Sequence, residues 1–277
     1  MIYIVASIVL EMIIIGGYYI LGYDVLNGKM PEGNWVDRVP FYGMAGFAMI
    51  TLLYVKFVEK RSLSEIGIVW NKKIVYSMIR GMVIGALMVT LMIGIFMITG
   101  LGVYRGKGNI SLCSVLLWGI AYIIQSFTEE IMCRGFLQTS LSRRVNPQLA
   151  IALTSLAFMA PHLSSMLEMS GWTMVVGIVN LLLVSCLFSV IMIKEESLGA
   201  PCGMHFGWNF CLGIVFGLSV SGGDGGNGVV RILVKPGHTL LTGGIYGIEA
   251  SVLLLPELVS IILICGIWIK KRRSYGI

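Results

Sequence analysis

Two adjacent glutamates and an arginine occur in FTEEIMCRGF, residues 127–136, directly after a run that is otherwise apolar enough to span a membrane. A charged side chain in the middle of a bilayer costs about 2.5–3.5 kcal/mol on insertion scales, so such residues are rare and mostly functional. Glu130 and Arg134 have i, i+4 spacing with the acid first, which favours an ion pair. Glu129 points about 100° away from Glu130. We therefore predict that Glu129 is a reactive acid and that Glu130 and Arg134 support it.

The alternative is that these charges lie at the membrane surface, where long side chains reach water at little cost. Arg143 and Arg144 lie farther along the same segment and mark a better surface position. If Arg143 and Arg144 lie at the membrane surface, Glu129 and Glu130 lie inside the membrane.

Two more polar groups occur in apolar segments. In FMAPH, residues 158–162, Pro161 cannot donate a backbone N–H, so we predict a helix kink beside His162. In HFGWN, His205 and Asn209 have i, i+4 spacing, so both can donate hydrogen bonds toward one point, as an oxyanion hole requires. Each residue taken singly is more often a packing or interhelical contact. Because two of the chain's three histidines follow the glutamates in this way, we favour a shared pocket.

The elements that must position these groups are membrane helices. The chain of 277 residues is 57% hydrophobic and 12% charged, with a mean hydropathy of +0.88, which excludes an ordinary soluble domain. We predict an all-α, polytopic membrane protein of about eight transmembrane helices, forming a single domain over residues 1–277 with the catalytic motifs in residues 125–210. The predicted spans are residues 2–22, 41–58, 75–100, 111–133, 147–166, 172–193, 201–219 and 248–269.

The net charge of +6 comes from short connectors and the C-terminal segment, which indicates membrane orientation and argues against nucleic-acid binding. An even number of spans places both termini on one side. The basic connectors 59–73, 142–144 and 270–273 fall on that side, so the positive-inside rule predicts a multi-pass protein of a cytoplasmic membrane with both termini in the cytoplasm.

The connectors predicted on the outer side are residues 24–38 and 221–239. The second contains a formal G-x-G-x-x-G match at residues 223–228. The strand and helix that give this fingerprint its phosphate-binding geometry do not flank it, so we interpret the segment as a flexible loop.

The three motifs read Glu129-Glu130-x-x-x-Arg134, Phe158-x-x-x-His162 and His205-x-x-x-Asn209. In order and spacing they resemble the signature of the CAAX protease and bacteriocin-processing (CPBP, or Abi) family of intramembrane glutamate-type proteases, which includes the type II CAAX prenyl endopeptidases. SLSEIGI, residues 62–68, also resembles a segment common in bacterial members. The first span and the outer loops contain none of the family's motifs, so the resemblance does not extend to them.

The resemblance implies an eight-helix membrane fold with a peptidase site that opens toward the cytoplasm. Glu129 with His162 would activate the attacking water as a general base. His205 and Asn209 would stabilise the oxyanion, and Phe158 would support the site beside Glu130 and Arg134. We predict a membrane-bound or hydrophobic peptide substrate, contact with the lipid bilayer, no cofactor and no metal ion.

One position departs from the family pattern. In prenyl-protein endopeptidases an asparagine usually stands four residues after the first histidine, and Met166 stands there in this chain. The departure argues against a CAAX substrate more than against protease activity.

Three other hypotheses stay open. Glu129, His162 and His205 could instead be the ligands of a zinc protease with an open fourth position. The chain could be a non-catalytic membrane partner, such as a bacteriocin immunity protein. A transporter is disfavoured because the two halves share no interrupted helices at matching positions.

The depth of the two histidines poses a further question. Counted from the nearest basic connectors, His162 lies deeper in the membrane than His205. A kink at Pro161 and an inward loop over residues 195–200 would bring them to one level.

Overall fold

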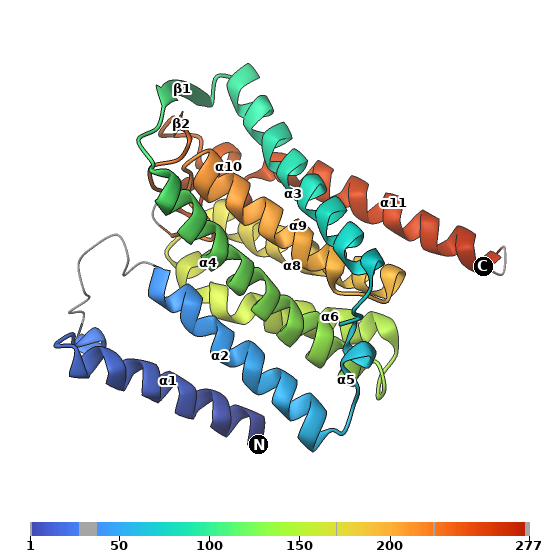
Figure 1. Cartoon of the computed structure of the whole chain (residues 1–277). Helices are drawn as coiled ribbons and strands as arrows, with labels where there is room; N and C mark the ends of the chain where they lie inside the picture. The colour runs from blue at the N-terminus through green and yellow to red at the C-terminus, as the bar shows by residue number, and fades with distance from the viewer. Residues whose placement is uncertain (1, 28–37, 170, 224, 275–277) are drawn as a thin grey trace.

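The computed structural model describes residues 2–27, 38–169, 171–223 and 225–274, which form a helical bundle (Figure 1). This architecture confirms the all-α prediction. The main helices are α1 (Ile2–Ile20), α2 (Val39–Leu53), α3 (Lys72–Ile98), α4 (Leu112–Glu130), α6 (Pro147–Met159), α8 (Gly171–Glu195), α9 (Gly199–Phe210) and α11 (Leu255–Ser274). Shorter helices are α5 (Thr139–Leu141), α7 (Leu163–Leu167) and α10 (Thr239–Thr242).

In the described residues, five helical segments are long and apolar enough to cross a membrane. They are residues 40–58, 72–98, 112–141, 147–167 and 171–195. Two apolar helices, Glu11–Ile20 and Val252–Gly266, are shorter. A polytopic membrane protein is thereby confirmed. The predicted start of the last span was wrong, because residues Ile248–Ala250 and Val252–Leu254 form 3₁₀ turns and α11 begins only at Leu255.

Helix α9 lies at the centre of the bundle and contacts α3, α4 and α8. A stripe of glycines lets the backbones of α3 and α9 approach closely, as small residues do between membrane helices. A Cβ atom added to Gly203 would lie 2.0 Å from the carbonyl oxygen of Met78. The stripe consists of Gly81 and Gly85 on α3 and Gly199, Gly203 and Gly207 on α9. It fixes the position of α9, which carries His205 and Asn209.

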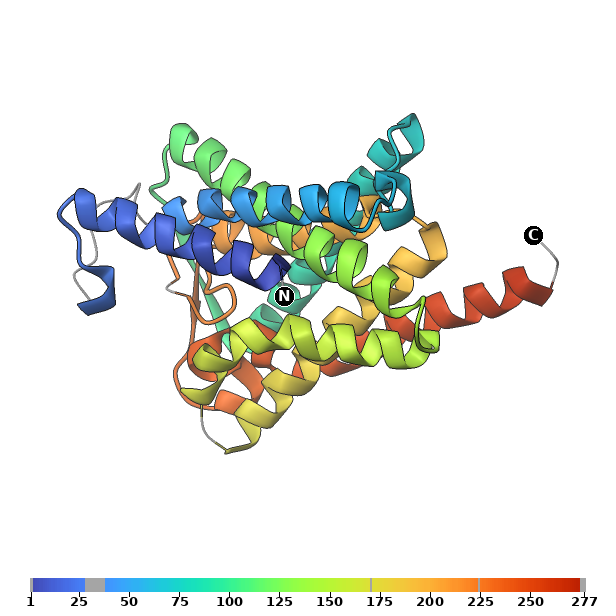
Figure 2. The same ribbon diagram turned by 90° about the horizontal axis from the view of Figure 1, so that it is seen from below.

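The other helices surround this pair. α6 and α11 pack against α8, α2 packs against α4, and α1 lies on the outside against α2 (Figure 2). α1 runs toward the end of the bundle that carries the sheet, and α11 runs away from it (Figure 1). The start of α1 and the end of α11 therefore point to the same end of the bundle (Figure 1).

One two-stranded antiparallel sheet closes the opposite end. β1 (Gly102–Lys107) pairs with β2 (Val230–Val234). The predicted outer connector, residues 221–239, thus contains a strand, which lies after the G-x-G-x-x-G match of residues 223–228. Two connectors at the same end of the bundle lie side by side, and their backbones satisfy each other's hydrogen bonds. Asp224 and most of the predicted outer loop at residues 24–38 lie outside the described residues.

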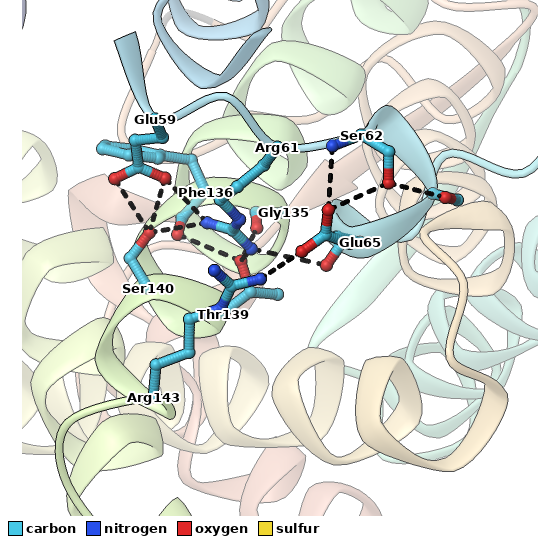
Figure 3. A network of polar contacts seen from close by, with 10 residues as sticks. Glu59, Arg61, Ser62, Glu65, Gly135, Phe136, Thr139, Ser140 and Arg143 are labelled. Carbon is cyan, nitrogen blue, oxygen red and sulfur yellow. Dashed lines mark hydrogen bonds and ion pairs between the residues drawn. The ribbon is translucent and has the colours of Figure 1, made fainter.

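The connector between α2 and α3 is fastened to α5 by a buried arginine (Figure 3). Arg61 is 5% exposed and donates to Thr139 Oγ1 at 2.6 Å and Ser140 Oγ at 2.8 Å. It also pairs with Glu59 at 2.9 Å. Arg61, with its charge balanced by Glu59, thus holds the C-terminal end of the helical segment that begins with α4.

The same connector contains a capping box, in which Ser62 and Glu65 cap the 3₁₀ helix Leu63–Ile66. Arg143 pairs with Glu65 from the end of the neighbouring helical segment (Figure 3). The Ser62 backbone N–H, with the Arg143 guanidinium, holds the pKa of Glu65 below its ordinary value. Glu65 therefore joins two connectors at this end of the bundle.

Candidate active site

The predicted ion pair between Glu130 and Arg134 is present at the end of α4. The helix continues from Glu130 into a π-helical turn, Ile131–Gln138, a wide turn that occurs mostly at functional sites. Arg134 Nη1 donates to Glu130 Oε1 at 3.0 Å, and neither side chain is exposed. This charge pair is completely enclosed by protein.

Arg134 also joins three helices. Its Nη2 atom donates to the backbone oxygen and the hydroxyl of Ser185 on α8, at 3.1 and 2.7 Å. The guanidinium carbon lies 4.3 Å from the ring centroid of Phe158 on α6 and 5.2 Å from that of Phe188 on α8. Aromatic faces attract a desolvated cation. Phe158 thus contacts the arginine that it was predicted to support.

Glu130 has a second partner that sequence analysis missed. Its Oε1 atom lies 3.0 Å from His205 Nδ1, so Glu130 orients the imidazole as well as neutralising Arg134. His205 also stacks on Phe188, with ring centroids 5.4 Å apart. With Nδ1 held by Glu130, Nε2 is the ring nitrogen left to act on a substrate.

Glu129 faces that nitrogen. Its Oε2 atom lies 3.8 Å from His205 Nε2, which is too long for a direct hydrogen bond, and it has no hydrogen-bond partner in the part of the chain that the structure describes. Its side chain is 16% exposed, whereas that of Glu130 is fully buried. The two adjacent glutamates therefore occupy different environments, as predicted from their angular positions on the helix.

Gln125 connects Glu129 with Asn209. Its Nε2 atom donates to Glu129 Oε1 at 3.3 Å, and its Oε1 atom accepts from Asn209 Nδ2 at 3.2 Å. Sequence analysis did not single out Gln125. Its i−4 spacing from Glu129 was the available signal.

His162 lies at the predicted break in its helix. The α-helix ends at Met159, and residues Ala160–His162 form a 3₁₀ turn. His162 Nδ1 lies 3.0 Å from the carbonyl oxygen of Phe158. Because a carbonyl can only accept, Nδ1 carries the hydrogen, and Nε2 is left for other partners. No hydrogen bond or ion pair joins His162 to Glu129 among the described residues.

His162, His205 and Asn209 line one cavity of about 40 Å³. Such a volume holds a few water molecules at most, and a buried water requires two to four polar partners. Ser221 and Glu249 supply further polar groups, and α3, α8 and α11 supply apolar ones. Glu129 is not part of this lining and reaches His205 from α4. The structure thus brings Glu129, His205 and Asn209 together and places His162 on the same cavity as the latter two.

The connection between α8 and α9 is fastened to α3. Glu195, the last residue of α8, accepts hydrogen bonds from Ser77 and Arg80, which lie beyond the first turn of α3. The first turn of α9 is buried, and His205, on its second turn, lines the same cavity as His162.

Met166, which replaces the family's asparagine, is fully buried. It packs with Met169, Tyr246 and Ala250 and does not line the cavity. Its role is therefore packing.

A zinc site would need its ligands close together. Within the described residues, no three His, Cys, Asp or Glu side chains are grouped so that they could hold a metal ion. Glu129, His162 and His205 are therefore not grouped as the ligands of a metal ion in this part of the chain.

Comparison with known proteins adds one finding. The family model "type II CAAX prenyl endopeptidase Rce1-like" matches residues 110–211, which contain all three motifs from Glu129 to Asn209. This match confirms the resemblance noted in the sequence. No curated protein and no solved structure matches the chain.

Proposed function

We propose that this chain, an intramembrane protease with an Rce1-like domain, hydrolyses a peptide bond in a hydrophobic or membrane-associated peptide by direct attack of an activated water. The observation that carries the proposal is the difference between the two glutamates. Glu130 is enclosed and bound to Arg134 and His205, whereas Glu129 is partly exposed, and its Oε2 atom beside His205 Nε2 has no hydrogen-bond partner among the described residues.

In this mechanism the Oε2 atom of Glu129 takes a proton from the attacking water as general base. The oxygen of the scissile carbonyl lies near His205 Nε2 and Asn209. A protonated His205 donates from Nε2 while Nδ1 stays bound to Glu130, and Asn209 uses the amide hydrogen that Gln125 does not accept. Donors fixed before the reaction stabilise the developing oxyanion and cost no reorganisation.

His162 completes the proton transfer. Its Nε2 atom can accept a proton because Nδ1 carries the ring hydrogen and donates it to the carbonyl oxygen of Phe158, and the side chain lines the cavity. We assign it to orienting the water or to carrying the proton that Glu129 has taken from the water on to the leaving amine, which returns Glu129 to its carboxylate form. The C–N bond breaks, the new carboxyl keeps the water oxygen, and the amine takes the proton. No cofactor or metal ion enters this scheme.

The setting of the reaction is also part of the proposal. The basic connectors support a cytoplasmic membrane with both termini in the cytoplasm. The enclosed contacts that join α4, α6, α8 and α9 support one domain over residues 1–277. Met166 in the core, where prenyl endopeptidases have asparagine, favours a substrate without a prenyl group.

A comparison of peptide termini tests the function. Membranes and medium from cells that carry the wild type, Glu129→Gln or Glu168→Gln would be profiled at equal protein levels. Glu168 is an exposed glutamate in the turn after α7 and serves as the matched control. We expect a set of new termini with the wild type and Glu168→Gln that disappears with Glu129→Gln. Identical profiles for all three would favour a non-catalytic partner such as an immunity protein.

A further inference from the structure

One acidic residue of the cavity has no place in the mechanism above. Glu249 lies in the 3₁₀ turn Ile248–Ala250, just before α11, and its side chain is partly buried and lines the cavity with His162, His205 and Asn209. It also lies beyond residues 110–211, where the family model matches. Neither the three motifs nor the match therefore assigns it a role.

Three elements hold Glu249 in place. Trp208 Nε1 on α9 donates to Oε1 at 2.9 Å, and the Ser221 backbone N–H donates to Oε2. Asn180 on α8 donates to the Glu249 backbone oxygen at 2.8 Å. Each carboxyl oxygen accepts from a donor, which is the pattern of an ionised carboxylate.

The Ser221 amide reaches Glu249 from a strained backbone. Ser221 has φ of 52°, in the left-handed region that costs a residue with a side chain on the order of 1–3 kcal/mol. Such strain persists only where the surroundings fix it, and here the Glu249 bond is part of that fixation. Ser165 Oγ contacts both the Ser221 oxygen at 3.3 Å and the His162 oxygen at 3.1 Å. The segments that carry Glu249 and His162 are thus linked.

Burial raises the pKa of Glu249, whereas the two donors, Ser221 and Trp208, and the imidazoles of His162 and His205, with which it shares the cavity, act in the opposite direction and favour the carboxylate. The phenol groups of Tyr246 and of Tyr122 on α4 also interact with the Glu249 carboxylate. His205 already has two carboxylates beside it, Glu129 and Glu130. His162 has no ion pair among the described residues, so Glu249 is the acid that can balance a positive charge on it.

We propose that Glu249 is a positioning residue of the active site, which acts through His162 by balancing the charge that the imidazole gains while it carries the water's proton. The inference rests on the proposed function. Glu249 itself neither gains nor loses a proton in the cycle. Its charge favours the protonated imidazole until the leaving amine takes the proton.

The alternative is that Glu249 only anchors Trp208 and Ser221. Four variants separate the two roles. Glu249→Gln removes the charge, and Glu249→Asp keeps it on a shorter side chain. Trp208→Phe removes one anchoring bond and keeps the charge. Glu257→Gln is the matched control, because Glu257 lies in the first turn of α11 and does not line the cavity.

The first readout needs no substrate. Nitrogen-15 NMR of the detergent-solubilised chain resolves histidine rings, and the chain has only three histidines. At one fixed, mildly acidic pH we expect the His162 ring signals to move toward the neutral form in Glu249→Gln. They should stay in place in Glu257→Gln, and His238, outside the cavity lining, serves as an internal reference. Unchanged His162 signals in Glu249→Gln would overturn the inference.

The second readout is cleavage of the peptide found by terminal profiling. We expect Glu249→Gln to lower kcat about 10- to 100-fold with KM nearly unchanged, as for partners that orient a functional histidine. Glu249→Asp should recover part of the loss, and Trp208→Phe should lose less than Glu249→Gln. Equal losses in Trp208→Phe and Glu249→Gln, matched by equal losses of thermal stability, would mean anchoring only. If the wild type cleaves nothing, the proposed function fails, and the NMR readout still decides the charge coupling.

Discussion

Substitution of Glu130 by glutamine removes one charge from the buried pair and keeps the shape of the side chain. Arg134 would keep its bonds to Ser185 and its contacts with two aromatic rings, but it would lose its counter-charge in a fully enclosed site. Breaking a buried ion pair from one side costs about 3–5 kcal/mol. Since the amide oxygen of glutamine still accepts one hydrogen bond, we expect the lower end of that range.

A loss of about 3 kcal/mol corresponds to a fall in Tm of roughly 6–12 °C, at about 2–4 °C per kcal/mol for chains of similar size. Thermal unfolding in detergent micelles, followed by circular dichroism, measures it. Glu129→Gln is the control. It replaces a partly exposed carboxylate whose one hydrogen bond is worth about 1 kcal/mol, so its Tm should fall by no more than about 4 °C.

The single variant Arg134→Met and the double variant Glu130→Gln with Arg134→Met close a thermodynamic cycle. Replacing both members of a buried pair is often nearly neutral, so the double variant should be more stable than Glu130→Gln alone. A Tm for Glu130→Gln within about 2 °C of the wild type would refute the structural role of Glu130. A larger loss in Glu129→Gln than in Glu130→Gln would refute the division of roles between the two glutamates.

Two further predictions concern the scaffold. Gly203→Ala should prevent close packing of α3 and α9, because the new Cβ would lie 2.0 Å from the Met78 carbonyl oxygen. Gly94→Ala is the control: no atom lies within 4 Å of its new Cβ, so this variant should be neutral or slightly stabilising. Yield of monodisperse protein and Tm compare the two variants, and equal behaviour would contradict the packing of these helices. Arg61→Met should release the α2–α3 connector, because Arg61 binds it to Thr139 and Ser140. We expect faster amide hydrogen exchange over residues 59–71 and unchanged exchange in α9. Unchanged exchange in the connector would show that other contacts hold it.

Sequence could predict the parts of the site that depend on spacing along one helix. The Glu130–Arg134 pair follows from i, i+4 geometry, and the break at residues 160–162 follows from the missing N–H of Pro161. Gln125 belongs to the same class and was missed although its spacing from Glu129 is regular.

Contacts between distant segments could not be derived in this way. Helical spacing gives the direction of a side chain around its own helix, but the rotation and depth of each helix depend on packing against others. The second partner of Glu130, on α9, depends on the glycine stripe that sets the position of that helix. The pairing of β1 with β2 and the contact of Glu249 with Trp208 likewise join segments that only the fold brings together.

Incorporation of oxygen from labelled water tests the central claim most directly. Purified protein in lipid nanodiscs would be incubated in H₂¹⁸O with peptides extracted from membranes, and new C-termini would be read by mass spectrometry. We predict new termini that each carry one ¹⁸O with the wild type and none with Glu129→Gln. Labelled termini that persist at the wild-type rate in Glu129→Gln would contradict the assignment of Glu129 as the residue that activates water.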